Sequence, residues 1–348
     1  MNFEVNGHSI FSIVLVTFLA SALFVPIAKK VAFHIGAIDK PDKRKIHNKP
    51  MPRLGGLAIF FAFLLGYMLY AQSSIQMLSI LIGGFIIVIT GICDDIKPVR
   101  ARYKLIMQVV AAAIVACYGK MLFNDFSMLG FSFVFPYPLN YLVTIVFIVA
   151  ITNAINLIDG TDGLASGVST IYFLTVAIIA VILNKFNGLD ITLSVIMLGA
   201  TLGFLLHNFP PASIFMGDTG SNFLGFMISV ISLVGFKTAT ITSLIIPLLI
   251  LAVPIVDTVF AIFRRLLKGE NIATADKEHL HHQLLNMKFS KKKTVLVIYG
   301  INILFALVSI FYVLGDDKIA LGIYVFLMIF LLFLVLKTNI LFDHNKNK

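Results

Sequence analysis

The stretch that decides the fold is YLVTIVFIVAITNAINLIDGTDGLASGVSTIYFLTV, residues 141–176. Two apolar runs flank a short polar segment, and each continues towards the roughly 20 residues that a membrane-spanning helix needs. The polar segment carries four oxygen-bearing side chains spaced three apart, namely Asn153, Asn156, Asp159 and Asp162. Gly160 and Gly163 lie among them and allow the chain to break and turn. The stretch therefore predicts two membrane helices joined by a polar turn.

The whole chain has the composition of an integral membrane protein. Of its 348 residues, 59% are hydrophobic and 13% are charged, with mean hydropathy +0.98. Soluble domains carry roughly 25% charged residues. The apolar runs do not alternate in polarity as the strands of a membrane β-barrel do. They lie near 9–28, 54–71, 77–93, 104–122, 138–156, 163–183, 190–207, 220–236, 239–263, 295–314 and 319–338. We predict an all-α polytopic membrane protein with about eleven transmembrane helices.

The distribution of Lys and Arg predicts the orientation of the chain. The segment before the first run has no Lys or Arg, whereas Lys29 and Lys30 follow that run, so we expect an uncleaved helix with its N-terminus outside. Eleven helices then place the C-terminus in the cytoplasm. This arrangement assigns 23 Lys and Arg to the inside and 4 to the outside, which together make the 27 in the chain. The positive-inside rule supports the assignment.

The same orientation gathers the unusual polar residues on the cytoplasmic face of one membrane domain, residues 1–348. We expect the active-site loops near 29–53, 94–104, 157–162, 208–219 and 264–294. The net charge of +10 could attract anionic lipid or an anionic substrate. A nucleic-acid partner is not expected, because no soluble domain is predicted that could present a groove-reading element.

An acid pair closes the third predicted helix, in GICDDIKPVRARYK, residues 91–104. Adjacent helical side chains point about 100° apart, so one of Asp94 and Asp95 can face a site while the other faces a neighbouring helix. Lys97, Arg100, Arg102 and Lys104 follow. Paired carboxylates beside cations suit a phosphate together with a metal ion. A solvated helix end is the alternative, although the C-terminal end of a helix disfavours anions.

Two further segments bear on a site at this face. In 153–163 we assign Asn156, Asp159 and Asp162 to function, whereas Asn153 could equally hydrogen-bond a neighbouring helix.

In HNFPPASIFMGDTGSNFLG, residues 207–225, small residues around Asp218 open the eighth predicted helix. A helix N-terminus of this kind favours a phosphate, and the alternative is that Asp218 is an ordinary N-cap.

The remaining motifs are basic or rich in histidine. KEHLHHQLL, residues 277–285, places His279, His281 and His282 within four residues, which suggests contact with a metal or a phosphate; a partly exposed loop is the alternative. The basic motif is GAIDKPDKRKIHNKPMPRLGG, residues 36–56. It could belong to the site, or it could be a tether that binds lipid beside the membrane. Asp257 lies inside a predicted helix, where we expect a structural ion pair with Arg264.

Five ordered motifs together resemble the polyprenyl-phosphate N-acetylhexosamine-1-phosphate transferases: DKPDKRKIHNKPMPRLGG, the DD pair with Lys104, NAINLIDGTDGL, FMGDTGS and HLHH. The resemblance is to the bacterial WecA/TagO branch, which transfers GlcNAc-1-phosphate from UDP-GlcNAc to undecaprenyl phosphate. It leans towards the enzymes that begin wall teichoic acid synthesis. The related MurNAc-pentapeptide phosphate transferases usually have an uninterrupted histidine run, whereas Leu280 interrupts it here. That reaction is the main alternative, and a transporter is a distant one because no internal repeat is found.

The resemblance implies a role for each matched residue. Asp218 would bind Mg²⁺, or Mn²⁺ as the alternative, with help from Asn156. Asp94 or Asp95 would act as base or orienter for the lipid phosphate. Asp159 would lie beside these acids. Asp162, Gly160 and Phe215 would contact uracil. The phosphates and the sugar would be held by Lys104, His279, His281 and His282, and His47 and Arg53 would lie near the nucleotide-sugar.

The resemblance also implies a setting and a course for the reaction. The enzyme would be a multi-pass protein of the bacterial plasma membrane, in contact with the lipid bilayer. It could act as a homodimer. A lipid-phosphate oxygen would attack the β-phosphorus of UDP-GlcNAc in line, either directly or after an Asp-phosphate intermediate, and UMP would leave. Positioning and charge neutralisation supply most of the rate in such phosphoryl transfers.

Overall fold

The computed structural model describes residues 3–39, 50–128, 131–235, 245–267, 269, 279–315 and 317–337. His47 therefore lies outside the described residues. The chain divides into two compact units, Met1–Leu244 and Ile245–Lys348, and each is described by itself.

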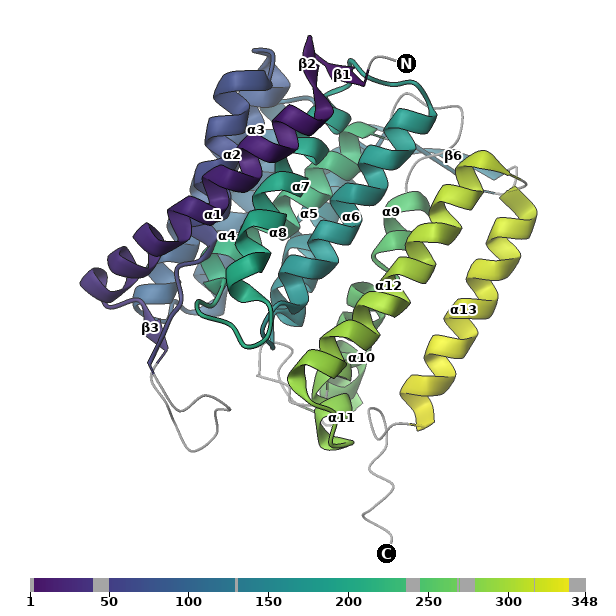
Figure 1. The fold of residues 1–348 in the computed structure, drawn as a ribbon. Helices are drawn as coiled ribbons and strands as arrows, with labels where there is room; N and C mark the ends of the chain where they lie inside the picture. The colour runs from purple at the N-terminus through teal and green to yellow at the C-terminus, as the bar shows by residue number, and fades with distance from the viewer. Residues whose placement is uncertain are drawn as a thin grey trace, which may run out of the picture. The chain divides into compact units, whose positions relative to one another are not determined.

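The first unit is a bundle of long helices with three short hairpins (Figure 1). Its helices are α1 (Ile10–Ile35), α2 (Gly56–Tyr70), α3 (Ile75–Ile96), α4 (Ala101–Ala113), α5 (Leu139–Ile158), α6 (Leu164–Ile182), α7 (Leu189–Asn208) and α8 (Gly217–Gly235), and a π-helical turn, η1 (Ile114–Tyr118), extends α4. The antiparallel pairs are β1 (Glu4–Val5) with β2 (His8–Ser9), β3 (Ile38–Asp39) with β4 (Met51–Pro52), and β5 (Asp125–Met128) with β6 (Phe131–Val134).

The second unit is also helical. It contains α9 (Ile245–Ile250), α10 (Ala252–Leu267), α11 (Leu280–Asn286), α12 (Lys291–Leu314) and α13 (Asp317–Lys337). The apolar run predicted at 239–263 is not one helix where the structure describes it, because α9 ends at Ile250 and α10 begins at Ala252. Pro254 lies four residues after Ile250 and has no backbone N–H to donate to its carbonyl, which accounts for the break.

The prediction of an all-α polytopic membrane protein is confirmed. Seven of the described helices are long and apolar enough to cross a membrane. They are α1, α3, the continuous segment of α4 and η1, α5, α6, α7 and α12. The count of about eleven spans and the orientation of the chain stay predictions.

Helix α8 is buried along most of its length and packs against α2, α3 and α5 in the first unit. Glycines permit the close approach. A Cβ atom on Gly56 of α2 would collide with the backbone of Gly220, and one on Gly91 of α3 would collide with the backbone of Thr219. Small residues at such contacts let membrane helices come together closely. The first turn of α8 is therefore held between the start of α2 and the last turns of α3.

Candidate functional site

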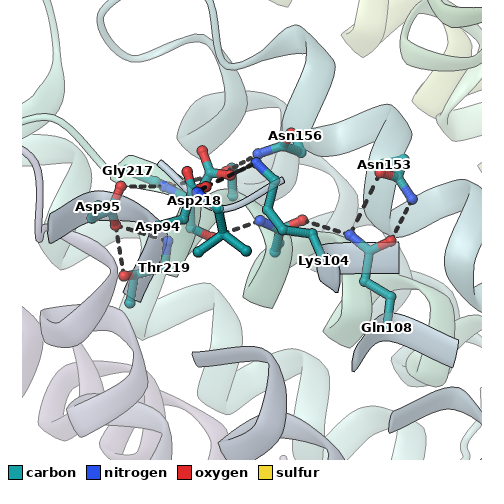
Figure 2. Close-up of polar contacts among 12 residues, drawn as sticks. Asp94, Asp95, Lys104, Gln108, Asn153, Asn156, Gly217, Asp218 and Thr219 are labelled. Carbon is teal, nitrogen blue, oxygen red and sulfur yellow. Dashed lines mark hydrogen bonds and ion pairs between the residues drawn. The ribbon is translucent and has the colours of Figure 1, made fainter. Parts of the chain in front are cut away.

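Polar residues predicted from three separate motifs meet in the first unit (Figure 2). The last turn of α3 supplies Asp94 and Asp95, and the first turn of α8 supplies Asp218. Lys104 reaches them from the first turn of α4, and Asn156 lies nearby in the last turn of α5. Elements far apart in the sequence thus place their helix ends around one cluster of charge.

Asp95 caps the N-terminus of α8. Its Oδ1 accepts a hydrogen bond from the backbone N of Asp218 at 2.9 Å. Its Oδ2 accepts two hydrogen bonds from Thr219, from the backbone N at 3.0 Å and from Oγ1 at 2.7 Å. A carboxylate at this position satisfies donors that a helix N-terminus leaves free and complements its dipole.

This capping limits which donors at the start of α8 could bind a phosphate, because the N–H groups of Asp218 and Thr219 are already bonded to the Asp95 carboxylate. Phosphate binding at this helix end stays a prediction. Asp218 is not the N-cap, because it lies inside α8 and the capping carboxylate comes from α3. Gly217 makes this arrangement possible. Its φ of +71° is a left-handed conformation, and a Cβ atom there would collide with Arg53 O and with the Asp95 carboxylate.

Asp94 has the different environment that the 100° spacing predicts. Lys104 Nζ lies 3.3 Å from Asp94 Oδ1 and 2.8 Å from Asp218 Oδ2. Asp94 Oδ1 also accepts a hydrogen bond from Val99 N at 2.8 Å. Lys104 therefore joins Asp94 and Asp218, while Asp95 is committed to the backbone of α8.

Arg53 supplies a second cation to the same cluster. Its Nη2 lies 3.6 Å from Asp95 Oδ1 and 3.9 Å from Asp218 Oδ1, and about a third of its side chain, 32%, is exposed. Arg53 is thus close to the acids, in the segment that leads into α2. The lysine and the arginine together offset part of the negative charge that three neighbouring carboxylates create.

The donor set fits a magnesium ion. Mg²⁺ takes one or two carboxylates from a protein and fills its other positions with water and substrate phosphates. Asp94 and Asp218 already share the Lys104 cation, so positive charge is favourable beside these two acids. Among the described residues no group of three or more His, Cys, Asp and Glu could hold a metal by itself. An ion at Asp218 would fill its other positions with water or with phosphate oxygens.

Asn156 and Asp159 lie at the end of α5, beside this cluster. Asn156 Nδ2 donates a hydrogen bond to Ser221 Oγ at 2.8 Å, so its amide oxygen is the atom that would serve a metal. Asp159 immediately follows α5. Burial and then the Asp218 carboxylate raise the pKa of Asp159 to about 7, although Arg53 acts in the opposite direction. The charge of Asp159 is consequently sensitive to pH near neutrality.

The turn after α5 is tied to the segment before α8. Asp162 Oδ2 accepts a hydrogen bond from Ala212 N at 3.2 Å, whereas Gly160 is exposed. Phe215, which is half-buried, exchanges backbone hydrogen bonds with Pro52 and Gly55. The residues expected to contact uracil thus come from two segments that are bonded to each other.

Asn208 joins these two segments and was not predicted as a site residue. Its Oδ1 accepts hydrogen bonds from Gly163 N at 3.0 Å and from Ser166 Oγ at 2.8 Å. Its Nδ2 donates to Ile214 O at 3.0 Å. Asn208 is 2% exposed. An amide this deep at the end of an apolar run was the signal that could have identified it, since buried polar groups need partners.

A second group of amides lies one turn away from the acids. Gln108 Nε2 donates to Asn222 Oδ1 at 3.0 Å, and Gln108 Oε1 accepts from Asn153 Nδ2 at 2.7 Å. Asn153 thus fits the helix-packing alternative, because it bonds a neighbouring helix (Figure 2). Gln108 and Asn222 were not predicted as site residues from the sequence. Their spacing of four residues from Lys104 and Asp218 was the available signal.

The histidines belong to the second unit and are described there. His279 Nδ1 lies 2.8 Å from Asp257 Oδ2, and Leu280 N donates to Asp257 Oδ1 at 2.9 Å. Asp257 is therefore paired with His279, a partner that the sequence did not predict, and the ion pair with Arg264 stays a prediction. Asp257 also caps the start of α11, and no sequence periodicity reports that contact.

The three imidazoles form one group, in which the ring centroids of His281 and His282 are 4.2 Å apart. Burial lowers the pKa of His281 to about 3, and neighbouring His282 and His279 act in the same direction against Asp257. Burial thus favours the neutral form of His281, and its contact with a phosphate stays a prediction. Its Nε2 is buried without a hydrogen-bond partner within the part of the chain that the structure describes.

Comparison with known proteins identifies the family. Residues 77–236 match the family model described as glycosyl transferase family 4. The chain is 44% identical over 301 residues to a Bacillus subtilis protein named probable undecaprenyl-phosphate N-acetylglucosaminyl 1-phosphate transferase, covering 85% of this chain and 83% of that protein.

Two further relatives carry related names. A decaprenyl-phosphate N-acetylglucosaminephosphotransferase of Mycolicibacterium smegmatis is 32% identical, covering 84% of this chain and 80% of that protein. An undecaprenyl-phosphate alpha-N-acetylglucosaminyl 1-phosphate transferase of Salmonella typhi is 30% identical, covering 81% of this chain and 78% of that protein. The motifs, the helical membrane fold and these matches agree, and the chain belongs to glycosyl transferase family 4, the family of the polyprenyl-phosphate N-acetylhexosamine-1-phosphate transferases.

Proposed function

We propose that the protein transfers GlcNAc-1-phosphate from UDP-GlcNAc to undecaprenyl phosphate, giving undecaprenyl-pyrophosphoryl-GlcNAc and UMP. The observation that carries the proposal is the position of Lys104 Nζ, 3.3 Å from Asp94 and 2.8 Å from Asp218. Two acids that share a cation provide what a pyrophosphate substrate with a metal ion requires. The names of the three relatives supply the substrate class.

In the reaction a lipid-phosphate oxygen attacks the β-phosphorus of UDP-GlcNAc. The bond from that phosphorus to the bridging oxygen breaks, and the bridging oxygen leaves with UMP. We assign Asp94 to the attacking phosphate, because Asp95 has both oxygens bonded to the backbone of α8. Asp94 would accept the proton of a monoprotonated lipid phosphate or orient its dianion. An Asp-phosphate intermediate remains the alternative course.

Asp218, supported by Asn156, would hold Mg²⁺, with Mn²⁺ as a substitute. The bound ion would neutralise charge on the pyrophosphate and on the departing UMP. Lys104 and Arg53 face the same carboxylates and would contact the phosphate oxygens once these acids are occupied. Asp159 would tune the local charge, since burial and Asp218 raise its pKa to about 7. The turn with Gly160 and Asp162, together with Phe215, would bind uracil.

We further propose that the reaction occurs at the cytoplasmic face of the bacterial plasma membrane. The supporting observation is the excess of Lys and Arg in the segments assigned to the inside, chiefly 29–53, 94–104 and 264–294. The three histidines of the second unit, and His47, would contact the phosphates or the sugar. The product would enter a cell-wall polymer, and the sequence resemblance favours wall teichoic acid.

A direct assay tests the proposal. Purified protein in nanodiscs is incubated with undecaprenyl phosphate, MgCl₂ and UDP-GlcNAc, and both UMP and the lipid-linked sugar are measured. UDP-MurNAc-pentapeptide replaces UDP-GlcNAc in a parallel reaction. Product from UDP-GlcNAc alone is the expected result. Product from the muramyl substrate alone would instead support the MurNAc-pentapeptide reaction, and release of no UMP from either would overturn both.

A further inference from the structure

Three amides, two buried and one half-buried, link three helices of the first unit. Gln108 of α4 stands at the centre, bonded to Asn222 of α8 at 3.0 Å and to Asn153 of α5 at 2.7 Å. Asn222 Nδ2 then donates to the carbonyl oxygen of Asp218 at 2.9 Å. Gln108 and Asn222 are 5% and 6% exposed. We call these three residues the amide network.

The amide network repeats the arrangement of the charged cluster one helical turn away. Gln108 is four residues after Lys104, and Asn222 is four residues after Asp218. Asn153 is three residues before Asn156, which bonds Ser221 of α8 at 2.8 Å. Residues three or four apart lie on one face of a helix. The same faces of α4, α5 and α8 therefore meet twice, first at Lys104, Asn156 and Asp218 and then at the three amides (Figure 2).

Polar side chains of this kind are costly inside a membrane protein and are usually functional. Interhelical hydrogen bonds between them contribute little to stability on average, so stability alone is a weak reason to keep three. The bond from Asn222 to Asp218 O provides another reason. It connects the network to the backbone of the residue whose carboxylate lies 2.8 Å from Lys104 Nζ.

We propose that Gln108, Asn153 and Asn222 form a positioning network that fixes the register of α4, α5 and α8. The network keeps Lys104 against Asp218 and Asn156 against Ser221. None of the three amides touches substrate, and each acts through the charged residue one turn away. The inference rests on the proposed transferase function, because the geometry it maintains is that of the assigned phosphate and metal site.

Two variants and a matched control test this role. Gln108→Met removes the central amide at nearly constant volume. The triple variant Gln108→Met, Asn153→Leu, Asn222→Leu removes every member, so no amide is left without a partner. Thr175→Val is the control, because Thr175 is a buried polar residue of α6 whose hydroxyl bonds its own helix, at Ile171 O. For each protein in nanodiscs, kcat, the KM for UDP-GlcNAc and the melting temperature are measured.

We expect Gln108→Met to lower kcat by roughly 10- to 100-fold, the loss that a small misplacement of reacting groups causes, with the KM for UDP-GlcNAc changed less than about threefold. The triple variant should regain the melting temperature, because replacing all partners with apolar groups is nearly neutral. It should not regain kcat. Thr175→Val should keep both values.

The inference is overturned if either network variant turns over within about threefold of the wild type, which would make the network a stability device only. If the triple variant does not fold, the kcat and KM of Gln108→Met decide alone. Failure of the proposed function has a different signature, since the wild-type protein would then release no UMP from UDP-GlcNAc.

Discussion

Asp95 Oδ2 accepts two hydrogen bonds from Thr219, one from the backbone N at 3.0 Å and one from Oγ1 at 2.7 Å. A carboxylate at the C-terminal end of one helix thus caps the N-terminal end of another. An acid is unfavourable at the C-terminal end of its own helix. The interaction with α8 offsets that cost and makes the position of Asp218 depend on Asp95. The two adjacent acids of α3 therefore have separable roles.

The first prediction concerns stability. Asp95→Asn keeps one acceptor oxygen but turns an NH₂ group towards the donors of α8, so it should lower the free energy of unfolding by about 1–3 kcal/mol, the cost of leaving a buried donor unsatisfied. Activity should fall with it, because Asp218 moves. Thermal unfolding in nanodiscs measures the effect. Thr219→Val removes only the hydrogen bond from Thr219 Oγ1 to Asp95 and should lower the free energy of unfolding by about 1 kcal/mol. If Asp95→Asn melts at the wild-type temperature, the capping role is wrong.

The second prediction concerns turnover. Asp94→Asn should lower kcat by about 10²- to 10⁴-fold, the usual range for loss of a group that handles a proton in the reaction. The melting temperature should change little, because the amide keeps an oxygen that can accept from Val99 N and Lys104 Nζ. UMP release and thermal unfolding are measured together with Asp95→Asn as the paired variant. Near-normal turnover of Asp94→Asn would assign the lipid phosphate to another group.

The contrast between these acids shows what the sequence could predict. Apolar run lengths predict the membrane helices, and helical geometry predicts that neighbours such as Asp94 and Asp95 face different ways. Which one faces the site depends on the rotation of α3 against α8, which no local pattern encodes. The same limit applies to Asn208 and Gln108, which form bonds with residues 45 or more positions away, namely Gly163, Asn153 and Asn222. Asp257 was assigned a neighbour on its own helix for this reason.

The third prediction concerns pH. Burial and Asp218 raise the pKa of Asp159 from 3.8 to about 7, so the folded chain holds a proton there that the unfolded chain releases. Stability should therefore fall as pH rises from about 4 to about 7 and then level off. Asp159→Asn should remove this part of the decline. Melting temperatures at pH 5 and pH 8, measured with EDTA to exclude metal ions, should show the variant gaining over the wild type mainly at pH 8. An equal difference at both pH values would contradict the shifted pKa.

The fourth prediction concerns nucleotide binding. Asn208 bonds Gly163 N and Ser166 Oγ on one side and Ile214 O on the other, so it holds the turn with Asp162 against the segment with Phe215. Asn208→Ala leaves these buried groups unpaired and should loosen both segments. We expect the KM for UDP-GlcNAc to rise about tenfold, equivalent to about 1.4 kcal/mol of binding energy. The value of kcat at saturation should change much less, because the acids are held by separate contacts.

Steady-state kinetics with each substrate varied in turn measure this effect. The KM for undecaprenyl phosphate should stay near that of the wild type, since Asn208 lies at the segments assigned to uracil. Ser166→Ala is the control, because it removes a single hydrogen bond to Asn208 and leaves the bonds to Gly163 and Ile214 in place. A smaller rise in KM is expected for it. A loss confined to kcat in Asn208→Ala would show that these segments serve the reacting phosphates, and the assignment of uracil to Asp162 and Phe215 would fail.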